Sequence, residues 1–216
     1  ALFETISDVI GKEGTLLVPA FSMSYTENEV FDMVNSASRV GMASEFFRQL
    51  PDTIRTLDPI YSFGVRGRRA DMFTRIESDS CFGRRSVFDE FFKLHGKILF
   101  LGCSVERATF IHYVEEIRGV SYRFFKDFSG TTVYPDRKEK QTNVCLYARD
   151  LTIDTFPDNS RVKAYLSQKG ALRYSQIGRI GCYAVDSVEF SDTVNQLLDG
   201  DEYAVIRAGR TSSRTQ

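Results

Sequence analysis

The most constraining feature of this chain is a short, uninterrupted apolar run that ends in a glycine and leads into an amphipathic segment. Ile98 to Leu101 is apolar throughout and is closed by Gly102. Such a run is typical of a buried strand. In the segment that follows, Phe110, Val114 and Ile117 recur at helical spacing, which predicts an amphipathic helix. The sequence therefore predicts a buried strand shortly before a helix.

The same alternation recurs along most of the chain. Helical patterns occur at residues 1–10, 27–35, 43–50, 87–94, 162–169 and 187–198. Strand patterns occur at residues 15–19, 98–101, 131–134, 142–148 and 178–185. The continuous apolar run at 15–19 indicates a central position in a sheet. Together these patterns predict an α/β fold, a layered α/β/α domain with a central mixed sheet and a small β-rich insertion at about residues 120–150.

Length and composition limit the classes of protein to which the chain can belong. Its 216 residues suit one domain over residues 1–206, followed by a polar tail at 207–216 that we expect to be disordered. A net charge of -1 argues against a nucleic-acid partner. No apolar run approaches the roughly 18 residues of a membrane span. We therefore expect small-molecule rather than nucleic-acid or membrane binding, and a homo-oligomer is compatible with these properties.

Cysteine usage indicates the compartment. None of the four cysteines forms a C-x-x-C pair or has zinc-finger spacing, so no metal site is predicted. Cys103 and Cys145 flank apolar runs, where reduced, buried thiols are common. The acidic Glu4 and Asp8 near the start do not fit a signal peptide. These features predict a cytoplasmic protein.

The most informative polar pair is His112 and Glu115. The chain has only two histidines, and this one has a carboxylate three residues later. On a helix the two are neighbours, and we expect them to share the less apolar face. An imidazole beside a carboxylate is a plausible general base near neutral pH. The alternative is a chance pair on a solvated helix, and the spacing alone does not decide between them.

A thiol and two arginine clusters are weaker candidates. Cys103 follows the strand at the Gly102 bend, where a dyad with His112 would make a thiol acyltransferase or hydrolase; a small buried apolar residue is the more common situation. The arginine clusters lie near Gly67 and Gly83 and suit phosphate, although most such clusters are simply solvated. Their members are Arg66, Arg68, Arg69, Arg84 and Arg85.

Seven segments, taken in order, resemble one known family. They are residues 14–22 (GTLLVPAFS), 46–48 (FFR), 55–63 (RTLDPIYSF), 81–83 (CFG) with Ser86, 96–102 (GKILFLG), 109–115 (TFIHYVE) and 178–181 (GRIG). In this order and spacing the chain resembles the aminoglycoside 3-N-acetyltransferase family of acetyl-CoA-dependent enzymes over nearly all of residues 1–206. The Thr-x-x-His-x-x-Glu motif is the most specific of these segments.

The resemblance implies an N-acetyltransferase with acetyl-CoA as cosubstrate. It makes His112 the base and Glu115 its supporting carboxylate. It also implies that five residues contribute to acetyl-CoA binding, namely Ser62, Phe63, Phe82, Gly83 and Thr109. The resemblance also implies that family members carry roughly another strand and helix before the point where this sequence begins, a segment that contacts the cosubstrate in the family.

Asp58-Pro59 is the second departure from the family pattern, because antibiotic-modifying members usually have His-Pro there. The dipeptide suits a turn, or a carboxylate that orients a cationic amine. The Asp-Pro form resembles the branch that acetylates amino sugars in polysaccharide biosynthesis, whose acceptors are usually nucleotide-linked. We therefore expect acetyl transfer to a nucleotide-linked amino sugar. The alternatives are an aminoglycoside antibiotic 3-N-acetyltransferase, with a role in antibiotic resistance, and a non-catalytic nucleotide- or sugar-binding domain.

Overall fold

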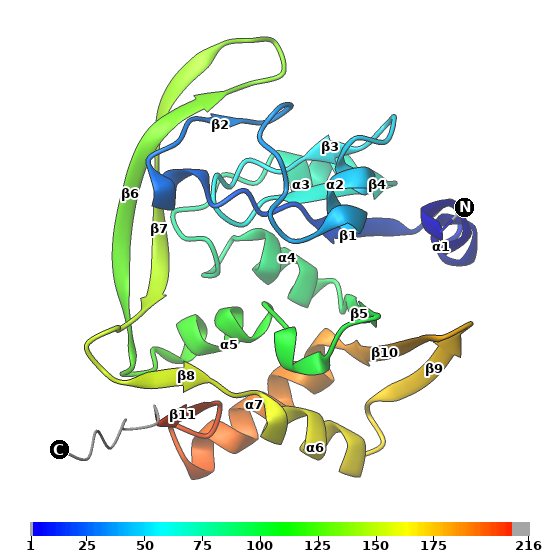
Figure 1. Cartoon of the computed structure of the whole chain (residues 1–216), viewed down its shortest axis with the longest axis vertical. Coiled ribbons are helices and arrows are strands. Elements are labelled where there is room, and N and C mark those ends of the chain that lie inside the picture. The colour runs from blue at the N-terminus through cyan, green and yellow to red at the C-terminus, as the bar shows by residue number, and fades with distance from the viewer. Residues whose placement is uncertain (1, 209–216) are drawn as a thin grey trace, which may run out of the picture. The chain divides into compact units, whose positions relative to one another are not determined.

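A computed structural model describes residues 2–208 (Figure 1). The chain divides into two compact units. Unit 1 comprises Ala1–Val87 and Phe125–Leu146, and unit 2 comprises Phe88–Phe124 and Tyr147–Gln216. Each unit contains both helices and strands, which confirms the α/β class. The single domain expected over residues 1–206 stays a prediction.

The first sheet of unit 1 is antiparallel and has the order β1-β4-β3. Its strands are β1 (Thr15–Pro19), β4 (Phe63–Gly67) and β3 (Ile54–Arg55). The helices of this unit are α1 (Leu2–Ile10), α2 (Met42–Arg48) and α3 (Ala70–Thr74). The central position expected for residues 15–19 is wrong, because β1 lies at an edge of this sheet. Contacts with α1 and α2 account for its apolar run instead.

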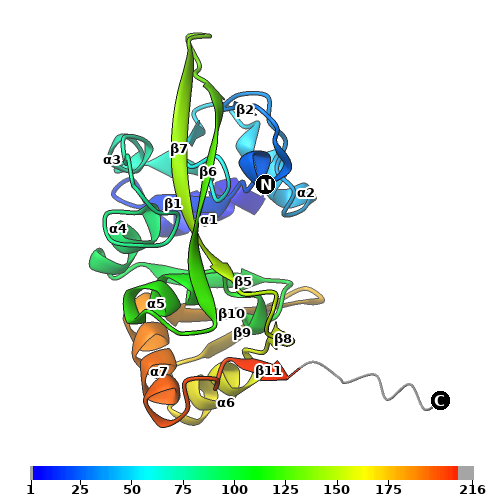
Figure 2. The same cartoon turned by 90° about the vertical axis from the view of Figure 1, so that its left-hand side faces the viewer.

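The second sheet of unit 1 contains a long hairpin. Strand β2 (Phe31–Asp32) pairs in parallel with β6 (Arg123–Val133), and β6 neighbours β7 (Glu139–Arg149). Figure 2 shows β6 and β7 side by side along their length. The β-rich segment and its two strands are confirmed, and both strands are longer than predicted. Each has one end in unit 2, so the hairpin carries the chain from unit 2 into unit 1 and back.

The helix expected at residues 27–35 is wrong. The chain forms the 3₁₀ turn η1 (Ser24–Glu27) and then β2. Asn28 follows the turn with φ of 60°, a left-handed conformation that stops helical propagation. The carboxylate of Asp32 accepts hydrogen bonds from the backbone N–H groups of Val34 and Asn35, both at 2.9 Å. This side chain gives the backbone an alternative to helical hydrogen bonds.

Three hydroxyl groups form a closed ring in unit 1. The Tyr25 hydroxyl lies 2.8 Å from Oγ1 of Thr132 and 2.7 Å from Oγ1 of Thr142, and the two threonine oxygens are 3.0 Å apart. Gly130 allows this approach, because a Cβ there would lie 2.7 Å from a ring carbon of Tyr25. The ring fixes η1 against both strands of the hairpin.

Unit 2 has an antiparallel sheet of order β5-β10-β9 and a smaller pair, β11-β8. The strands are β5 (Lys97–Leu101), β10 (Ile180–Asp186), β9 (Arg173–Ile177), β8 (Thr155–Pro157) and β11 (Ile206–Ala208). The helical elements are α4 (Val87–Lys93), η2 (Val105–Arg107), α5 (Ile111–Arg118), α6 (Ser160–Gln168) and α7 (Ser187–Gly200). The predicted helices and strands of this unit are confirmed, whereas β8 and β9 had no clear sequence signal.

Aromatic rings form the core around α5. The ring of Phe110 lies 5.8 Å from those of Phe91 and Phe190 and 5.3 Å from that of Tyr113, measured between ring centroids. These contacts fix the start of α5 against α4 and α7.

Two expectations concern the membrane and the C-terminal tail. None of the helices in residues 2–208 is long and apolar enough to cross a membrane. Within the polar tail expected at 207–216, residues 207 and 208 belong to β11. The expectation for residues 209–216 lies outside the described residues.

Candidate active site

Helix α5 and the turn that ends it bring four side chains of unit 2 together. His112 and Glu115 lie one turn apart on α5. Gly119 then adopts φ of 70°, and its N–H donates a 3.0 Å hydrogen bond to the carbonyl oxygen of Glu115. A glycine is favoured at this left-handed position because it has no Cβ. The turn places Tyr122 and Arg123 beside Glu115.

His112 and Glu115 form the dyad that the sequence predicted. Nδ1 of His112 lies 2.7 Å from Oε2 of Glu115. The His112 side chain is 21% exposed, whereas that of Glu115 is only 2% exposed. The expected polar face is therefore wrong for Glu115, which lies in the core while Ile117 is 40% exposed. The phenol of Tyr122 donates a 2.9 Å hydrogen bond to Oε1 and so satisfies the other oxygen of this carboxylate.

Arg123, at the start of β6, contacts both members of the dyad. Its Nε lies 2.8 Å from Oε2 of Glu115, and its Nη2 lies 2.9 Å from Nδ1 of His112. Its Nη1 donates a 3.0 Å hydrogen bond to the carbonyl oxygen of Tyr147. The Arg123 side chain is 7% exposed, so this ion pair is buried. Sequence reasoning missed Arg123, because nothing in its spacing links it to the motif on α5.

Burial and charge set the protonation of this group. Burial lowers the pKa of His112, and the nearby Arg123 charge lowers it further against the opposing effect of Glu115. Burial alone would raise the pKa of Glu115, but the hydrogen bond with His112, the Arg123 charge and the hydrogen bond from Tyr122 outweigh it, so this pKa is lowered. Burial and the Glu115 charge raise the pKa of Tyr122, which keeps its phenol a hydrogen-bond donor. The arrangement favours a neutral imidazole beside an ionised carboxylate–guanidinium pair.

Thr109 and Cys103 precede α5. Thr109 is partly exposed, and its carbonyl oxygen accepts a 3.0 Å hydrogen bond from the N–H of His112. Cys103 is exposed, so the expectation of a buried thiol is wrong there. Desolvation raises the pKa of the Cys103 thiol. A raised thiol pKa reduces the thiolate fraction at neutral pH, which disfavours Cys103 as a nucleophile.

Asp58 in unit 1 acts on its own backbone. One carboxylate oxygen accepts 2.7 Å hydrogen bonds from the N–H groups of Ile60 and Tyr61. This is the turn-forming geometry that the Asp-Pro pair suggested as one of two alternatives. Burial raises the pKa of Asp58, although these amides and a hydrogen bond from Cys81 oppose the rise. A role of Asp58 with an acceptor amine stays a prediction.

The residues expected to bind acetyl-CoA in unit 1 are buried. The Ser62 hydroxyl donates to the carbonyl oxygen of Ala20 at 2.9 Å and accepts from Nε of Arg55 at 3.0 Å. Phe63 and Phe82 belong to the core, and Gly83 is buried as well. These side chains support the structure around them, and their contact with a cosubstrate stays a prediction.

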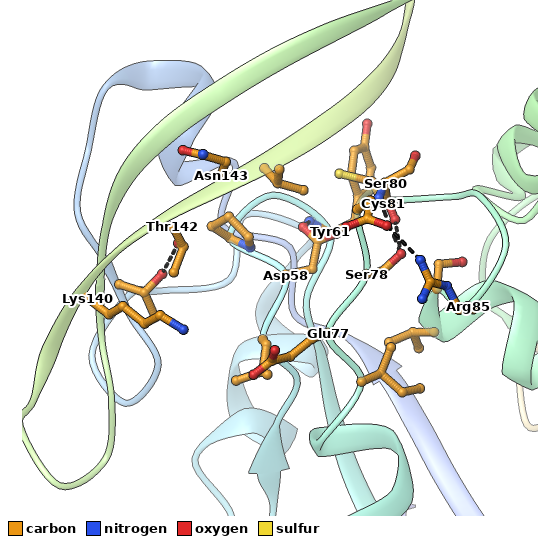
Figure 3. Close-up of a pocket in the computed structure, with 18 of the residues that line it drawn as sticks. Asp58, Tyr61, Glu77, Ser78, Ser80, Cys81, Arg85, Lys140, Thr142 and Asn143 are labelled. Carbon is orange, nitrogen blue, oxygen red and sulfur yellow. Dashed lines mark hydrogen bonds and ion pairs between the residues drawn. The ribbon is translucent and has the colours of Figure 1, made fainter.

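Unit 1 also contains a polar pocket of about 420 Å³ (Figure 3). Three stretches of the chain line it, at residues 57–61, 76–87 and 132–144. Figure 3 shows Asp58 and Tyr61 between Lys140 and Thr142 of the hairpin and the stretch that carries Ser80. Sequence reasoning missed this pocket, because its lining residues come from distant parts of the chain.

The two arginine clusters do not present unopposed positive charge. In the pocket, Nη2 of Arg85 lies 2.7 Å from Oδ2 of Asp79. In the other cluster, Arg68 forms an ion pair with Glu13. Carboxylates therefore compensate a member of each cluster, which weakens the expectation of phosphate binding.

A carboxylate–imidazole dyad of this kind can accept and release a proton near neutral pH. Comparison with known proteins gives the family. A sequence model of the aminoglycoside 3-N-acetyltransferase family matches residues 1–199, so the chain belongs to this family of N-acetyltransferases. The resemblance inferred from the seven segments is thereby confirmed at the level of the family. The branch acting on nucleotide-linked amino sugars is not supported by this match.

Solved structures agree with this assignment at the level of the fold. The structure of AAC-IIIb in a binary complex with CoASH has a TM-score of 0.77 at 20% identity, covering 98% of this chain and 84% of that chain. AAC(3)-IIb has a TM-score of 0.79 at 21% identity, covering 93% and 83%. AAC-VIa bound to sisomicin has a TM-score of 0.77 at 18% identity, covering 92% and 83%. The expected fold class and the acetyl-CoA chemistry of the family agree with these matches.

Proposed function

We propose that this protein is an acetyl-CoA-dependent N-acetyltransferase that acts on the amine of an amino sugar, with His112 as general base. The observation that carries the proposal is the 2.7 Å contact between Nδ1 of His112 and Oε2 of the buried Glu115. Family membership supports the reaction class.

The chemistry requires a group that removes a proton from the acceptor. An amine is protonated at neutral pH and cannot attack an acyl group until it has lost a proton. The lowered pKa of His112 keeps its imidazole neutral, so that it can accept this proton. With Nδ1–H donated to Glu115, the acceptor nitrogen of the ring is Nε2. Glu115 fixes the ring orientation and the tautomer.

Acetyl-CoA, when bound, supplies the acetyl group as an activated thioester. The family resemblance assigns several residues of this chain to acetyl-CoA binding, and we infer that most of them support the walls of its binding site. Phe63 and Phe82 are buried and would act by packing behind the wall of the cosubstrate channel, and the Ser62 hydroxyl is already engaged with Ala20 and Arg55. We infer that Ser62 shapes the wall of the cosubstrate channel and that backbone groups supply polar contacts there. Thr109 is the partly exposed member of the set.

Two acceptor classes compete. Similar structures were determined with the aminoglycosides sisomicin and gentamicin C1A, which favours an aminoglycoside acceptor. Asp58-Pro59 in place of the usual His-Pro favours a nucleotide-linked amino sugar of polysaccharide biosynthesis. Because Asp58 is bound to the amides of its own turn, its side chain gives the second class little independent support. We therefore place the aminoglycoside class first.

The test measures free-thiol release from acetyl-CoA with sisomicin, gentamicin and a panel of nucleotide-linked amino sugars. Mass spectrometry of the acceptor must show the addition of one acetyl group. His112→Gln should lower turnover by about 10²- to 10⁴-fold, the usual contribution of a general base, with little change in acetyl-CoA affinity. His95→Gln is the matched control, because it removes the other histidine from an exposed turn.

The result also separates an enzyme from a binding module. Full activity in His112→Gln would remove this residue from the mechanism. Calorimetry with acetyl-CoA tests whether the protein is instead a non-catalytic binding domain. Sugar binding without acetyl-CoA binding or turnover would identify a non-catalytic nucleotide- or sugar-binding domain and refute the proposal.

A further inference from the structure

The guanidinium group of Arg123 is placed to control the state in which His112 meets its substrate. We propose that Arg123 is a positioning residue, which takes up the charge of Glu115 so that His112 is presented as a neutral imidazole with its hydrogen on Nδ1. The inference rests on the proposed role of His112 as general base. It assigns Arg123 a function in the reaction that acts through its contacts with His112 and Glu115.

The contacts around Nδ1 cannot all be hydrogen bonds at once. Nδ1 of His112 lies 2.7 Å from the Glu115 carboxylate and 2.9 Å from Nη2 of Arg123. An ionised carboxylate only accepts and a guanidinium only donates. If Arg123 donates to Nδ1, the ring hydrogen moves to Nε2, and a neutral ring in this form cannot accept a proton there. If Nδ1–H donates to Glu115, Nε2 can act as the base.

The ion pair to Glu115 favours the second arrangement. Nε of Arg123 lies 2.8 Å from Oε2, the same oxygen that faces Nδ1. The guanidinium therefore reaches the carboxylate directly as an ion pair, although its Nε–H is not aligned for a hydrogen bond to Oε2. In a buried site, the attraction between opposite charges is screened much less than in water. Nη1 is held by the carbonyl oxygen of Tyr147 at 3.0 Å, which fixes the plane of the guanidinium.

Charge balance gives Arg123 a role that a purely structural residue would not have. Glu115 is 2% exposed and Arg123 7% exposed, so their charges are poorly screened by water. Without Arg123, the buried carboxylate would hold a proton on His112 as an imidazolium–carboxylate pair. An imidazolium cannot take a proton from an amine. The guanidinium thus keeps the base available by neutralising its partner.

Among residues 2–208, the ionisable groups considered around this arrangement come from α5, from the turn that ends it, and from β6 and β7. The charges that affect the pKa of His112 are Glu115 on its own helix and Arg123 on β6. Tyr122 acts on Glu115 through the 2.9 Å hydrogen bond to Oε1. Tyr147, on β7, holds Arg123 through its carbonyl oxygen, and burial raises the pKa of its own phenol.

Ring-proton NMR titration tests the inference directly, because the chain has only two histidines. His95, exposed in a turn, serves as an internal reference, and His95→Gln assigns the signals. Arg123→Gln should raise the titration midpoint of His112 by about one to three pH units. Arg123→Lys should raise it by less, because a compact ammonium keeps a charge near Glu115 but lacks the fork that also reaches Nδ1.

Arg118→Gln is the matched control. Arg118 lies on the same helix as the dyad but pairs with Asp199 of α7, 2.8 Å away. Its loss should leave the His112 midpoint unchanged. Should Arg123→Gln not fold, Arg123→Lys decides alone. An unchanged His112 midpoint in the folded Arg123 variants overturns the proposal.

Kinetics separates this inference from the proposed function. In Arg123→Gln, the acidic limb of the kcat/KM profile should move to higher pH. The loss at pH 6 should therefore exceed that at pH 8.5 by about tenfold or more, because the ratio of protonated to neutral imidazole changes tenfold per pH unit. Equal losses at both pH values would indicate a structural role and overturn the inference while leaving His112 as base. Full activity in His112→Gln would overturn the proposed function instead.

Discussion

The phenol of Tyr122 donates a 2.9 Å hydrogen bond to Oε1 of Glu115, and both side chains are buried. This contact satisfies the carboxylate oxygen that faces away from His112. Tyr122→Phe removes the donor and keeps the ring. Because hydrogen bonds to charged groups contribute about 1.5–3 kcal/mol, we expect unfolding free energy to fall by about this amount in denaturant titrations. Unchanged stability would show that this oxygen finds another donor.

The lowered pKa of His112 makes folding stability depend on pH. The unfolded state has the ordinary value of 6.5 and binds the proton more tightly than the folded state. The stability that the folded state gains by holding His112 neutral is therefore fully present above pH 6.5. It is lost as pH falls through that value toward the folded-state pKa. Unfolding free energy of the wild type should decline over this window, and that of His112→Gln should decline less. Parallel curves for the two proteins would contradict this.

The effect of Asp58 on the pH dependence of folding stability has the opposite sign to that of His112. Its pKa is raised above 3.8, so the folded state binds the proton more tightly and stability falls as pH rises from 3.8 through the folded-state pKa. Asp58→Asn keeps an oxygen for the amides of Ile60 and Tyr61 and removes the partly buried charge. We expect it to match or exceed wild-type stability at pH 7 in thermal unfolding.

The matched variant Asp58→Ala leaves both amides without their acceptor. It should lose about 1–3 kcal/mol of unfolding free energy, the usual cost of an unsatisfied buried polar group. Equal stability of the alanine and asparagine variants would show that the turn does not depend on this side chain.

Replacement of Cys103 distinguishes direct acetyl transfer from transfer through an acyl-thiol intermediate. Its thiol is exposed and has a raised pKa, which leaves little thiolate at neutral pH. Cys103→Ala should therefore retain turnover within about twofold of the wild type, since a protonated thiol contributes little nucleophilic catalysis. The measurement is thiol release from acetyl-CoA at saturating acceptor. Complete loss of activity would favour the thiol route.

Local patterns predicted much of the fold, because periodicity reports burial within one element. The helices that contain Phe47, Phe88 and Val114 follow from such patterns. The edge position of β1 could not be predicted, because a continuous apolar run does not distinguish cover by helices from cover by strands. The wrong helix at 27–35 had a local cause in the conformations of Asn28 and Asp32.

The candidate site was predictable only where its members are close in sequence. His112 and Glu115 meet because three residues separate them on one helix. Arg123 and Tyr122 reach the same carboxylate through the turn at Gly119, and no periodic pattern connects them to α5. The burial of Glu115 could not be read from composition either, since a carboxylate enters a core only when partners of this kind are present.

The hydroxyl ring of Tyr25, Thr132 and Thr142 has a consequence for the order of events during synthesis. Tyr25 emerges from the ribosome 107 positions before Thr132. The first stretch of unit 1 must therefore wait for the hairpin before this cluster can close. A slip of β6 by one residue would point Thr132 to the opposite side of the strand and break these hydrogen bonds. The three hydroxyl groups can therefore form their hydrogen bonds only when the hairpin pairs with the turn at Tyr25 in the correct register.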